Sequence, residues 1–557
     1  MANQLSFFAF LATASASSLV CSEVKSLYQE AQCCDSSGDT PVTPACVTPT
    51  PNYGFPSCYS TFQNLDKQYV RNLPLDYIPS NEGYVYLPYS NASLSDCASL
   101  PPNVVQHIPH ASPLGMAFLS TALDSALSPH YEGMLAMAMT GSWNRYPGTP
   151  TGFEINVARI ASAGNGVLKS MHYEHLIAAE YVNEYQQRYR PSDIMQLFPA
   201  SEVTLVSLWT YEDAASYGVG KIVTTNGTHH AVDLLLPLPG MRRLAQTATH
   251  VYMAVDATSG GMAPIPQYQL YVQSGLVPAT SKGAVLSILK TDLLSKSNAS
   301  LRVILHDVLD PDGIDVVNGD LYVSTSQMSS DSFGNSLLKV ANIESVVTQG
   351  NLPVTPTVVA SGLTYVHDHH PLSTMKISPD GEYAVMSMAA SCNLGCQGVV
   401  FAVKLSDGSK YEVANGLRNP TGFAFKDGYI FIADMGSDLG LGVIDYDTGF
   451  YAPAGAFGPG VPAVDLIAGG QNGPNDRVVA QKWYTPTKGY APVCMDDPFG
   501  RIAASGLSCP TLVASEGCTG TFAWTSKTAQ LISEMFGGFE TRSVGMDCPL
   551  SCNSCPA

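Results

Sequence analysis

The sequence predicts an all-β chain whose main body is a six-bladed β-propeller. Between about residues 70 and 490, β-prone segments of four to eight residues alternate with Gly, Asp and Asn turns. One hairpin type recurs, in which a D-G or G-D turn precedes an apolar strand, at residues 319–324, 380–386 and 427–433. Related segments occupy residues 134–138 and 250–255. A pair of β-sandwiches would supply similar strands without repeating one unit, whereas radial blades repeat it.

Composition narrows the class of protein. The 557 residues include 27 basic and 46 acidic side chains, a net charge of −19, which argues against nucleic acid as a partner. Only 13% of residues are charged and 45% are hydrophobic, so the chain has ample core and is not disordered throughout. No apolar run reaches the ~18–20 residues that a membrane-spanning helix needs.

The N-terminus predicts secretion. Residues 5–20 are apolar and end in small residues, and residues 14–16 (ASA) resemble a signal-peptidase site, so we expect residues 1–16 to be a signal peptide, although no Lys or Arg precedes the apolar stretch. Glycosylation sequons at Asn91, Asn226 and Asn298 and fourteen cysteines fit an extracellular protein. Residues 17–70 form a Cys-containing segment with a Thr- and Pro-rich linker, ahead of a propeller at residues 71–490.

The cysteines gather near the two ends of the chain. Six precede residue 100, Cys392 and Cys396 are expected to form a local disulfide, and six fall in residues 494–555. The last set opens with C-x-D and closes with C-P-x-S-C-x-x-C, and it resembles the ShK toxin-type module. That resemblance implies the bridges Cys494–Cys555, Cys509–Cys548 and Cys518–Cys552. A zinc site is the competing interpretation, but no His lies among these cysteines.

Four stretches of the body carry a second resemblance. They are residues 370–381 (HPLSTMKISPDG) with 391–396 (SCNLGC), residues 416–425 (GLRNPTGFAF) with 434–440 (DMGSDLG), residues 110–118 (HASPLGMAF) and residues 141–145 (GSWNR). Together they resemble the soluble quinoprotein sugar dehydrogenases, including the sorbosone and pyranose dehydrogenase-like propellers. In that family the last two stretches follow the second, whereas here they come first. We therefore expect a circular permutation, with His110, Arg145, His370 and Arg418 on one axial face.

The resemblance implies a secreted oxidoreductase that oxidises a sugar hydroxyl by hydride transfer to bound pyrroloquinoline quinone, with Ca²⁺ polarising the quinone. His370 matches the family's base, and an imidazole with a pKa of roughly 6.5 suits that role. Residues 367–370 (HDHH) are also compatible with a metal-binding cluster or a solvated polar loop. The chain has no C-x-x-C-H haem motif, so electrons would leave to a separate acceptor.

The quinone carries carboxylates, which planar cationic donors bind well. The resemblance therefore implies cofactor contacts for Arg418, Arg145 and His110, and a neutral hydrogen bond from Asn419. Each residue also has a structural interpretation. In that interpretation, Arg418 and Asn419 tie blades together through backbone hydrogen bonds, Arg145 stacks on Trp143, and His110 is a hydrogen-bonded blade-edge residue.

Departures from the family pattern keep other functions open. Ser373, Thr140 and Met435 stand where the family has Arg, His and Asn. A non-catalytic extracellular propeller that binds glycan or protein is the alternative function. A third hypothesis is a calcium-dependent hydrolase with Asp310, Asp312 and Asp315 as ligands, although that loop also fits a turn before a strand. One further segment, residues 173–188, is predicted to be a helical insertion.

Overall fold

We describe the fold from a computed structural model of the chain. The residues it describes are 51, 58–60, 84–86, 103–107, 111–124, 126–141, 152–162, 168–178, 190–198, 203–209, 217–225, 229–238, 240–259, 263–264, 268–281, 283–308, 311–325, 335–363, 374–388, 398–435, 476–490, 508–516, 521–523 and 541–543.

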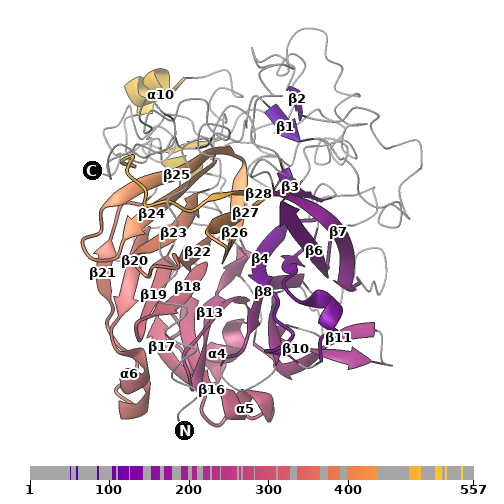
Figure 1. The fold of residues 1–557 in the computed structure, drawn as a ribbon. Coiled ribbons are helices and arrows are strands. Elements are labelled where there is room, and N and C mark those ends of the chain that lie inside the picture. Colours follow the sequence, from indigo (N-terminus) through magenta and orange to yellow (C-terminus); the bar gives the residue numbers. More distant parts are fainter. Residues whose placement is uncertain are drawn as a thin grey trace.

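Six four-stranded antiparallel sheets form a ring of blades (Figure 1), as the sequence predicts. The first blade contains β4 (Pro113–Phe118), β5 (Leu135–Met139), β6 (Glu154–Ser162) and β7 (Leu168–Ile177). The second contains β8 (Arg190–Gln196), β9 (Thr204–Trp209), β10 (Gly218–Thr225) and β11 (His229–Leu236). The third contains β12 (Met241–Gln246), β13 (His250–Asp256), β16 (Gly283–Leu289) and β17 (Arg302–His306).

The remaining three blades follow the same order from the inner to the outer strand. The fourth contains β18 (Gly313–Val317), β19 (Asp320–Thr325), β20 (Ser336–Val340) and β21 (Thr357–Ala360). The fifth contains β22 (Thr374–Ile377), β23 (Tyr383–Met388), β24 (Gly398–Lys404) and β25 (Lys410–Leu417). The sixth contains β26 (Asn419–Lys426), β27 (Tyr429–Met435), β28 (Arg477–Lys482) and β3 (Asn103–Gln106).

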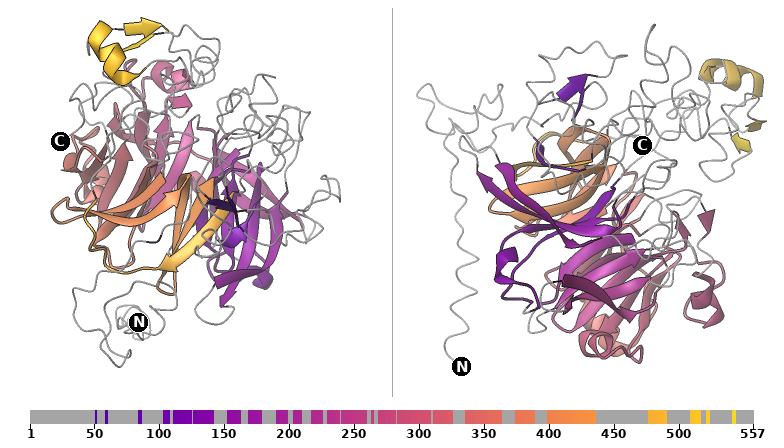
Figure 2. Two further views of the ribbon diagram at one scale, coloured as in Figure 1. Left: turned by 90° about the horizontal axis from the view of Figure 1, so that it is seen from above. Right: turned by 90° about the vertical axis from the view of Figure 1, so that its right-hand side faces the viewer.

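Strand β3 closes the ring. It precedes the first blade in the sequence but is the outermost strand of the sixth, where Val105 pairs with Val478 of β28. The inner strands of the sixth and first blades also meet, because the Thr421 Oγ1 donates to the carbonyl of Pro113. The left view of Figure 2, seen from above, shows the sheets arranged around a common axis. The first and last blades are therefore neighbours, which is the geometry that a circular permutation requires.

The predicted hairpins are present, and each predicted apolar segment is the second strand of its blade. Val317 pairs with Asp320 across the two-residue turn Asn318-Gly319, where φ is +52° and +80°. The turn at Asp427-Gly428 has φ values of +51° and +75°. Two consecutive positive φ angles define a type I′ turn, whose twist matches that of the flanking strands. Asn-Gly and Asp-Gly pairs adopt it at low cost, so the turn chemistry encodes these hairpins.

Six apolar cores hold the ring together, and each lies between two neighbouring blades. In the core between the sixth and first blades, Val105 and Met137 pack with Phe431 and Val478. The inner strands of these two blades approach closely at Gly422 of the GLRNPTGFAF stretch. A Cβ there would stand 2.0 Å from the carbonyl oxygen of Leu114, so only glycine fits.

Three two-stranded sheets and several short helices among the described residues lie outside the six blades. The two-stranded sheets are β1 (Cys58–Ser60) with β2 (Tyr84–Tyr86), β14 (Thr258–Ser259) with β15 (Ala263–Pro264), and β29 (Thr521–Ala523) with β30 (Thr541–Ser543). The helices are η2 (Pro129–Tyr131), α4 (Gln269–Gln273), α5 (Lys290–Leu294), α6 (Ile343–Gln349) and α10 (Cys509–Glu516). Within the described residues, none of the helices is long and apolar enough to cross a bilayer.

The predicted helix at residues 173–188 is wrong over its first five residues. Residues 173–177 belong to strand β7, which pairs with β6 from Ser162 back to Ile155. These residues are instead paired in an outer strand, whose successive side chains point to opposite faces. Its Tyr173 hydroxyl bonds to the buried His107 ring 2.8 Å away. The rest of that prediction, residues 179–188, lies outside the described residues.

Candidate functional site

The inner strands all begin at the same end of the ring, which we call the axial face. Contacts between neighbouring inner strands join their first residues. Ser192 of β8 donates to the carbonyl of Arg242 in β12, and Gly313 of β18 lies against Met375 of β22. Thr421 of β26 meets Pro113 of β4. Loops that precede inner strands therefore gather at this face, which is the usual ligand-binding position in ring-shaped β folds.

Arg243 closes the axis at this face. Its guanidinium donates to three main-chain carbonyl groups, those of Ser192 (2.7 Å), Asp312 (3.1 Å) and Thr421 (2.7 Å). The Ser192 carbonyl belongs to the second blade, the Asp312 carbonyl precedes the first strand of the fourth blade, and the Thr421 carbonyl belongs to the sixth blade. The Arg243 side chain therefore reaches across the ring. Only 7% of Arg243 is exposed. The Arg243 guanidinium therefore lies across the axis of the ring at this face.

Arg242, the residue before Arg243, contacts two aspartates and a tryptophan. Its Nη2 lies 3.4 Å from Asp256 Oδ2 and its Nε lies 3.4 Å from Asp312 Oδ1. Its guanidinium carbon stands 4.0 Å from the centre of the Trp209 ring, which is a cation–π contact. We call Arg242, Arg243, Asp256 and Asp312 the axial cluster. All four residues are buried.

Burial raises the pKa of Asp312 to about 6, with the nearby Asp256 adding to the rise and Arg242 and Arg243 opposing it. The carboxyl group therefore titrates near the pH at which most enzymes work. A buried carboxyl with a shifted pKa and defined charge partners is a feature of functional sites. The axial cluster therefore has the buried, paired charges that can orient a charged ligand.

Arg190 holds the start of the GSWNR stretch. Its Nη1 donates to the carbonyl groups of Thr140 (3.3 Å) and Gly141 (3.1 Å), and its guanidinium lies over the Phe153 ring. Gly141 has φ +96°, and a Cβ there would stand 2.3 Å from Phe153. Thr140 donates to the carbonyl of Pro191, 2.6 Å away. The first and second blades are therefore joined at this motif.

The two halves of the second motif meet at Asp434. Its Oδ1 accepts hydrogen bonds from the backbone N–H groups of Arg418 and Asn419, both at 2.9 Å. Its Oδ2 lies 2.9 Å from Arg477 Nε. The Asn419 amide is fully buried, and its Nδ2 donates to the sulfur of Met435. Asp434 therefore fixes the backbone that carries Arg418, which is itself 8% exposed.

Of the five predicted catalytic and cofactor-binding residues, the structure places Arg418 and Asn419 at the axial face. His110, Arg145 and His370 lie outside the described residues, so their convergence stays a prediction. Cys392, Cys396, Asn91, Asn226 and the substituted Ser373 lie outside them as well. In the C-terminal set, Cys509 is buried and disulfide-bonded at the start of α10. Its other cysteines, Cys494, Cys518, Cys548, Cys552 and Cys555, fall outside the described ranges, so the bridge pattern also remains predicted.

The acidic loop proposed as a calcium site faces cations of the protein itself. Asp312 pairs with Arg242, and Asp315 Oδ2 lies 3.4 Å from Lys376 Nζ. The pKa of Lys376 is raised, chiefly by the charge of Asp315. Asp310 lies outside the described residues. The two described carboxylates are thus engaged in ion pairs, which speaks against the calcium-dependent hydrolase.

Sequence reasoning missed several residues of this face, namely Arg190, Arg242, Arg243, Asp256 and Trp209. One signal was available. Strand β12 reads MRRLAQ, and two adjacent arginines are unusual in a buried strand of a chain with 13% charged residues. The partners Asp256 and Trp209 come from other strands and have no such local signal.

The fold and the site define a six-bladed β-propeller with buried charges at one axial face. No family model matches the chain, and no curated protein matches it. Among solved structures, it is similar to the calcium-binding protein regucalcin of Agrobacterium tumefaciens, with a TM-score of 0.38 and 10% identity over 70% of this chain and 98% of that one.

Two further structures resemble it to a similar degree. A gluconolactonase from Xanthomonas campestris has a TM-score of 0.36 and 10% identity, covering 71% of this chain and 96% of that one. A carbohydrate-active enzyme of family AA12 from Trichoderma reesei has a TM-score of 0.35 and 11% identity, covering 60% of this chain and 92% of that one. Likenesses this low carry no conclusion about activity, which has to be inferred from the residues.

Proposed function

We propose that the chain is a propeller oxidoreductase that oxidises a sugar hydroxyl, with pyrroloquinoline quinone as the hydride acceptor. The observation that carries the proposal is the gathering of buried arginines at the axial face, including Arg418 of the GLRNPTGFAF stretch. Each of the four sequence motifs has a described residue at this face, namely Met375, Arg418, Pro113 and Gly141.

The donor chemistry of this face fits such a cofactor. Carboxylates are bound most specifically by planar guanidinium groups. Arg418 is held in place through its backbone by Asp434. Arg190 and Arg243 donate to main-chain carbonyl groups at the same face. We propose that Arg418, together with Arg145, would hold the cofactor carboxylates. The quinone, when bound, supplies an acceptor for the hydride of the substrate C–H bond.

The other residues would position the reactants and control the proton. His370, our predicted base, would take the proton of the sugar hydroxyl at an imidazole nitrogen. Arg243 would hold the inner strands of different blades at fixed positions below the reactants. Asp256 and Asp312 orient Arg242, and Asp434 orients Arg418 and Asn419. Electrons would leave to a separate acceptor.

Reconstitution tests this proposal. The full chain is mixed with pyrroloquinoline quinone and Ca²⁺, quinone binding is measured by calorimetry, and dye reduction is followed with a panel of aldoses. We expect His370→Ala to lower kcat by about 10²–10⁴-fold while leaving quinone binding unchanged, because a general base contributes that much. Arg418→Ala should weaken quinone binding by about 10–100-fold, since hydrogen bonds between charged groups are worth roughly 1.5–3 kcal/mol. Arg302→Ala, at an exposed position, is the control.

The binding-propeller alternative is favoured by one observation. Met435 stands where the quinoprotein family has Asn, and its sulfur accepts the Asn419 amide, so a polar family position has become part of the packing. If the wild-type chain fails to bind the quinone, the dehydrogenase proposal is wrong. Saturable binding of an oligosaccharide without turnover, reduced by Arg190→Ala, would then support the glycan-binding propeller.

Secretion is part of the same proposal. Asn298 of the Asn-Ala-Ser sequon is exposed in a turn between α5 and β17, so an oligosaccharide could be attached there without disturbing a blade. Expression in a eukaryotic secretory host should yield a glycosylated chain in the medium. Asn298→Gln should lower the mass of the secreted chain by one glycan, as measured by mass spectrometry. A mass that shows no loss of a glycan would contradict modification at this residue.

A further inference from the structure

A second polar cluster lies on the outer side of the first blade, away from the axial face. It consists of His130, His172 and Glu174, and we call it the outer histidine site. His130 belongs to the 3₁₀ turn η2 between β4 and β5, whereas His172 and Glu174 belong to the outermost strand β7. Within the described parts of the chain, this is the one group of His, Cys, Asp or Glu side chains close enough to share a metal ion.

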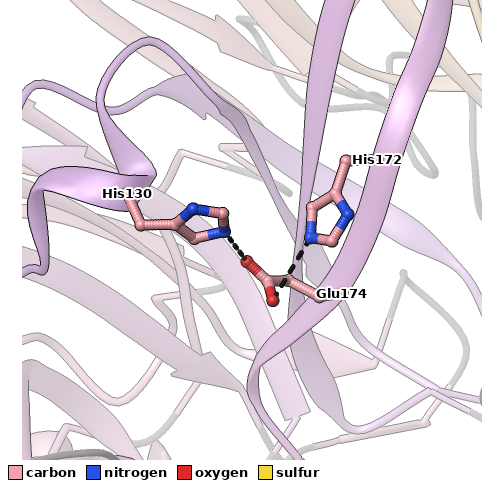
Figure 3. Close-up of side chains that lie close together, drawn as sticks. All are labelled: His130, His172 and Glu174. Carbon is pink, nitrogen blue, oxygen red and sulfur yellow. Dashed lines mark hydrogen bonds and ion pairs between the residues drawn. The ribbon is translucent and has the colours of Figure 1, made fainter.

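The three side chains converge on one point. Figure 3 shows both imidazoles directed at the Glu174 carboxylate. His130 Nε2 lies 2.7 Å from Glu174 Oε1, and His172 Nε2 lies 3.3 Å from Glu174 Oε2. The ligand atoms of the three residues all fall within 4.8 Å of one another. The two rings meet edge to face at 5.5 Å.

The backbone explains this convergence. His172 and Glu174 are two residues apart in a strand, so their side chains share one face. Tyr173 between them points the other way, to the buried His107. Arg159, opposite His172 in the β6–β7 ladder, donates 2.5 Å from its Nη2 to the carbonyl of His130. Arg159 therefore ties the η2 turn to the blade at the position that places His130 over the strand.

The ligand set selects the kind of metal. Two imidazole nitrogens and one carboxylate oxygen suit Zn²⁺, which commonly takes three protein ligands and leaves a fourth position to water. Ca²⁺ and Mg²⁺ prefer oxygen ligands throughout. All three side chains are partly exposed, His130 by 49%, His172 by 42% and Glu174 by 31%, so an ion can enter from solvent. As plain surface ion pairs the same contacts would add little to the stability of the fold.

We propose that His130, His172 and Glu174 bind a divalent transition-metal ion, Zn²⁺ foremost, which fastens the η2 turn to the outer strand of the first blade. The fourth coordination position faces solvent. This site is independent of the proposed sugar oxidation, because it uses the η2 turn and the outermost strand of the blade and none of the axial residues.

Metal titration of the full, metal-stripped chain tests the proposal. Zn²⁺ binding is measured by calorimetry, with Co²⁺ absorption as a report on coordination. We expect the wild-type chain to bind one equivalent of Zn²⁺. In His172→Gln and in Glu174→Gln, the affinity for Zn²⁺ should be lost or fall at least about tenfold, because even outer-shell ligand changes cost 10–100-fold. Zn²⁺ should raise the Tm of the wild-type chain and of neither variant. Excess Ca²⁺ should not displace the ion.

Two controls keep the outcome decisive. His306→Gln removes a similar His–carboxylate pair, in which His306 Nδ1 lies 2.7 Å from Asp307, and it should retain the equivalent of Zn²⁺. His370→Ala removes a histidine of residues 367–370, so any equivalent held there is counted separately. Circular dichroism confirms that each variant is folded. The proposal is wrong if wild-type chain binds no Zn²⁺, or if His172→Gln and Glu174→Gln bind it as wild type does.

Discussion

The two ends of the inner strands differ sharply in their surroundings. Strand β18 is buried at Gly313 and Ile314, becomes half-buried by Asp315, and leads into an exposed turn at Asn318 and Gly319. Strand β26 follows the same gradient, from six buried residues to an exposed turn at Asp427. Charged pairs occur at both ends. At the axial face, Arg242 and Asp256 expose 10% and 0% of their side chains, whereas Lys339 and Asp320 near the hairpin end expose 31% and 19%.

This difference decides how much each charge matters. A surface ion pair can be replaced by two hydrated side chains, so its loss costs little. A buried pair has no such substitute, since the remaining charge stays in a medium that solvates it poorly. The same residue types are therefore exchangeable at the hairpin end and tightly constrained at the axial face. This constraint is one reason to place the functional site there.

The largest expected effect comes from Arg242→Met. Removing this guanidinium leaves Asp256 and Asp312 buried without their shared partner, and we expect a loss of about 3–5 kcal/mol in the free energy of unfolding. Lys339→Met at the hairpin end should cost no more than about 1 kcal/mol. Urea unfolding of both variants measures the comparison. Equal losses would show that burial does not distinguish the two ends.

The pH dependence of stability should come next in size. The pKa of Asp312 is about 6 in the folded chain, above its unfolded value of roughly 3.9, so the folded state binds the proton more tightly. Its contribution to stability is therefore fully present below about pH 4 and declines as the pH rises to 6. We expect wild type to lose on the order of 2 kcal/mol relative to Asp312→Asn across this window.

Urea unfolding at several pH values between 4 and 7 measures that slope. Asp427→Asn, in an exposed turn, removes a carboxylate without touching the axial cluster and serves as the reference. If the free energies of unfolding of wild type and Asp312→Asn change equally between pH 4 and pH 7, the pKa of Asp312 is not raised.

A smaller effect is expected from Gly422→Ala. The new Cβ would meet the Leu114 carbonyl oxygen at 2.0 Å and push β26 away from β4, and overpacking of this kind costs about 1–3 kcal/mol. Gly489→Ala is the matched control, because a Cβ there meets nothing within 4 Å and the residue is exposed. Thermal unfolding should separate the two variants. Similar Tm values would mean that the closed ring tolerates wider spacing between its inner strands.

The smallest effect should come from Thr140→Val. The hydroxyl donates to the carbonyl of Pro191 at a buried junction between the first two blades, and its loss should cost about 1 kcal/mol. Ser274→Ala is the control, since the Ser274 hydroxyl bonds within its own turn to the Tyr271 carbonyl. Calorimetric Tm values measure both variants. A larger loss for Ser274→Ala would mean that the contact between the blades is not the more important one.

Local sequence determined the repeated hairpins of this protein. The Asn318-Gly319 and Asp427-Gly428 turns and the apolar strands beside them encode their structure within a few residues, so both the all-β class and the propeller could be predicted. The prediction of a helix at residues 173–177 was wrong because outer-strand pairing with β6 overrode a helix-like pattern. Motif resemblance also drew attention to Arg418 and Asn419, which the structure places at the axial face.

Only the tertiary structure brought Arg242 together with Asp256, Asp312 and Trp209, and His130 together with His172 and Glu174. Arg243 closes the axis because its guanidinium reaches carbonyl groups of three blades that are distant in sequence. Periodicity and turn chemistry describe each blade separately. Charge pairing, pKa shifts and metal-ligand sets depend on distances between strands and blades, which exist only once the ring has closed.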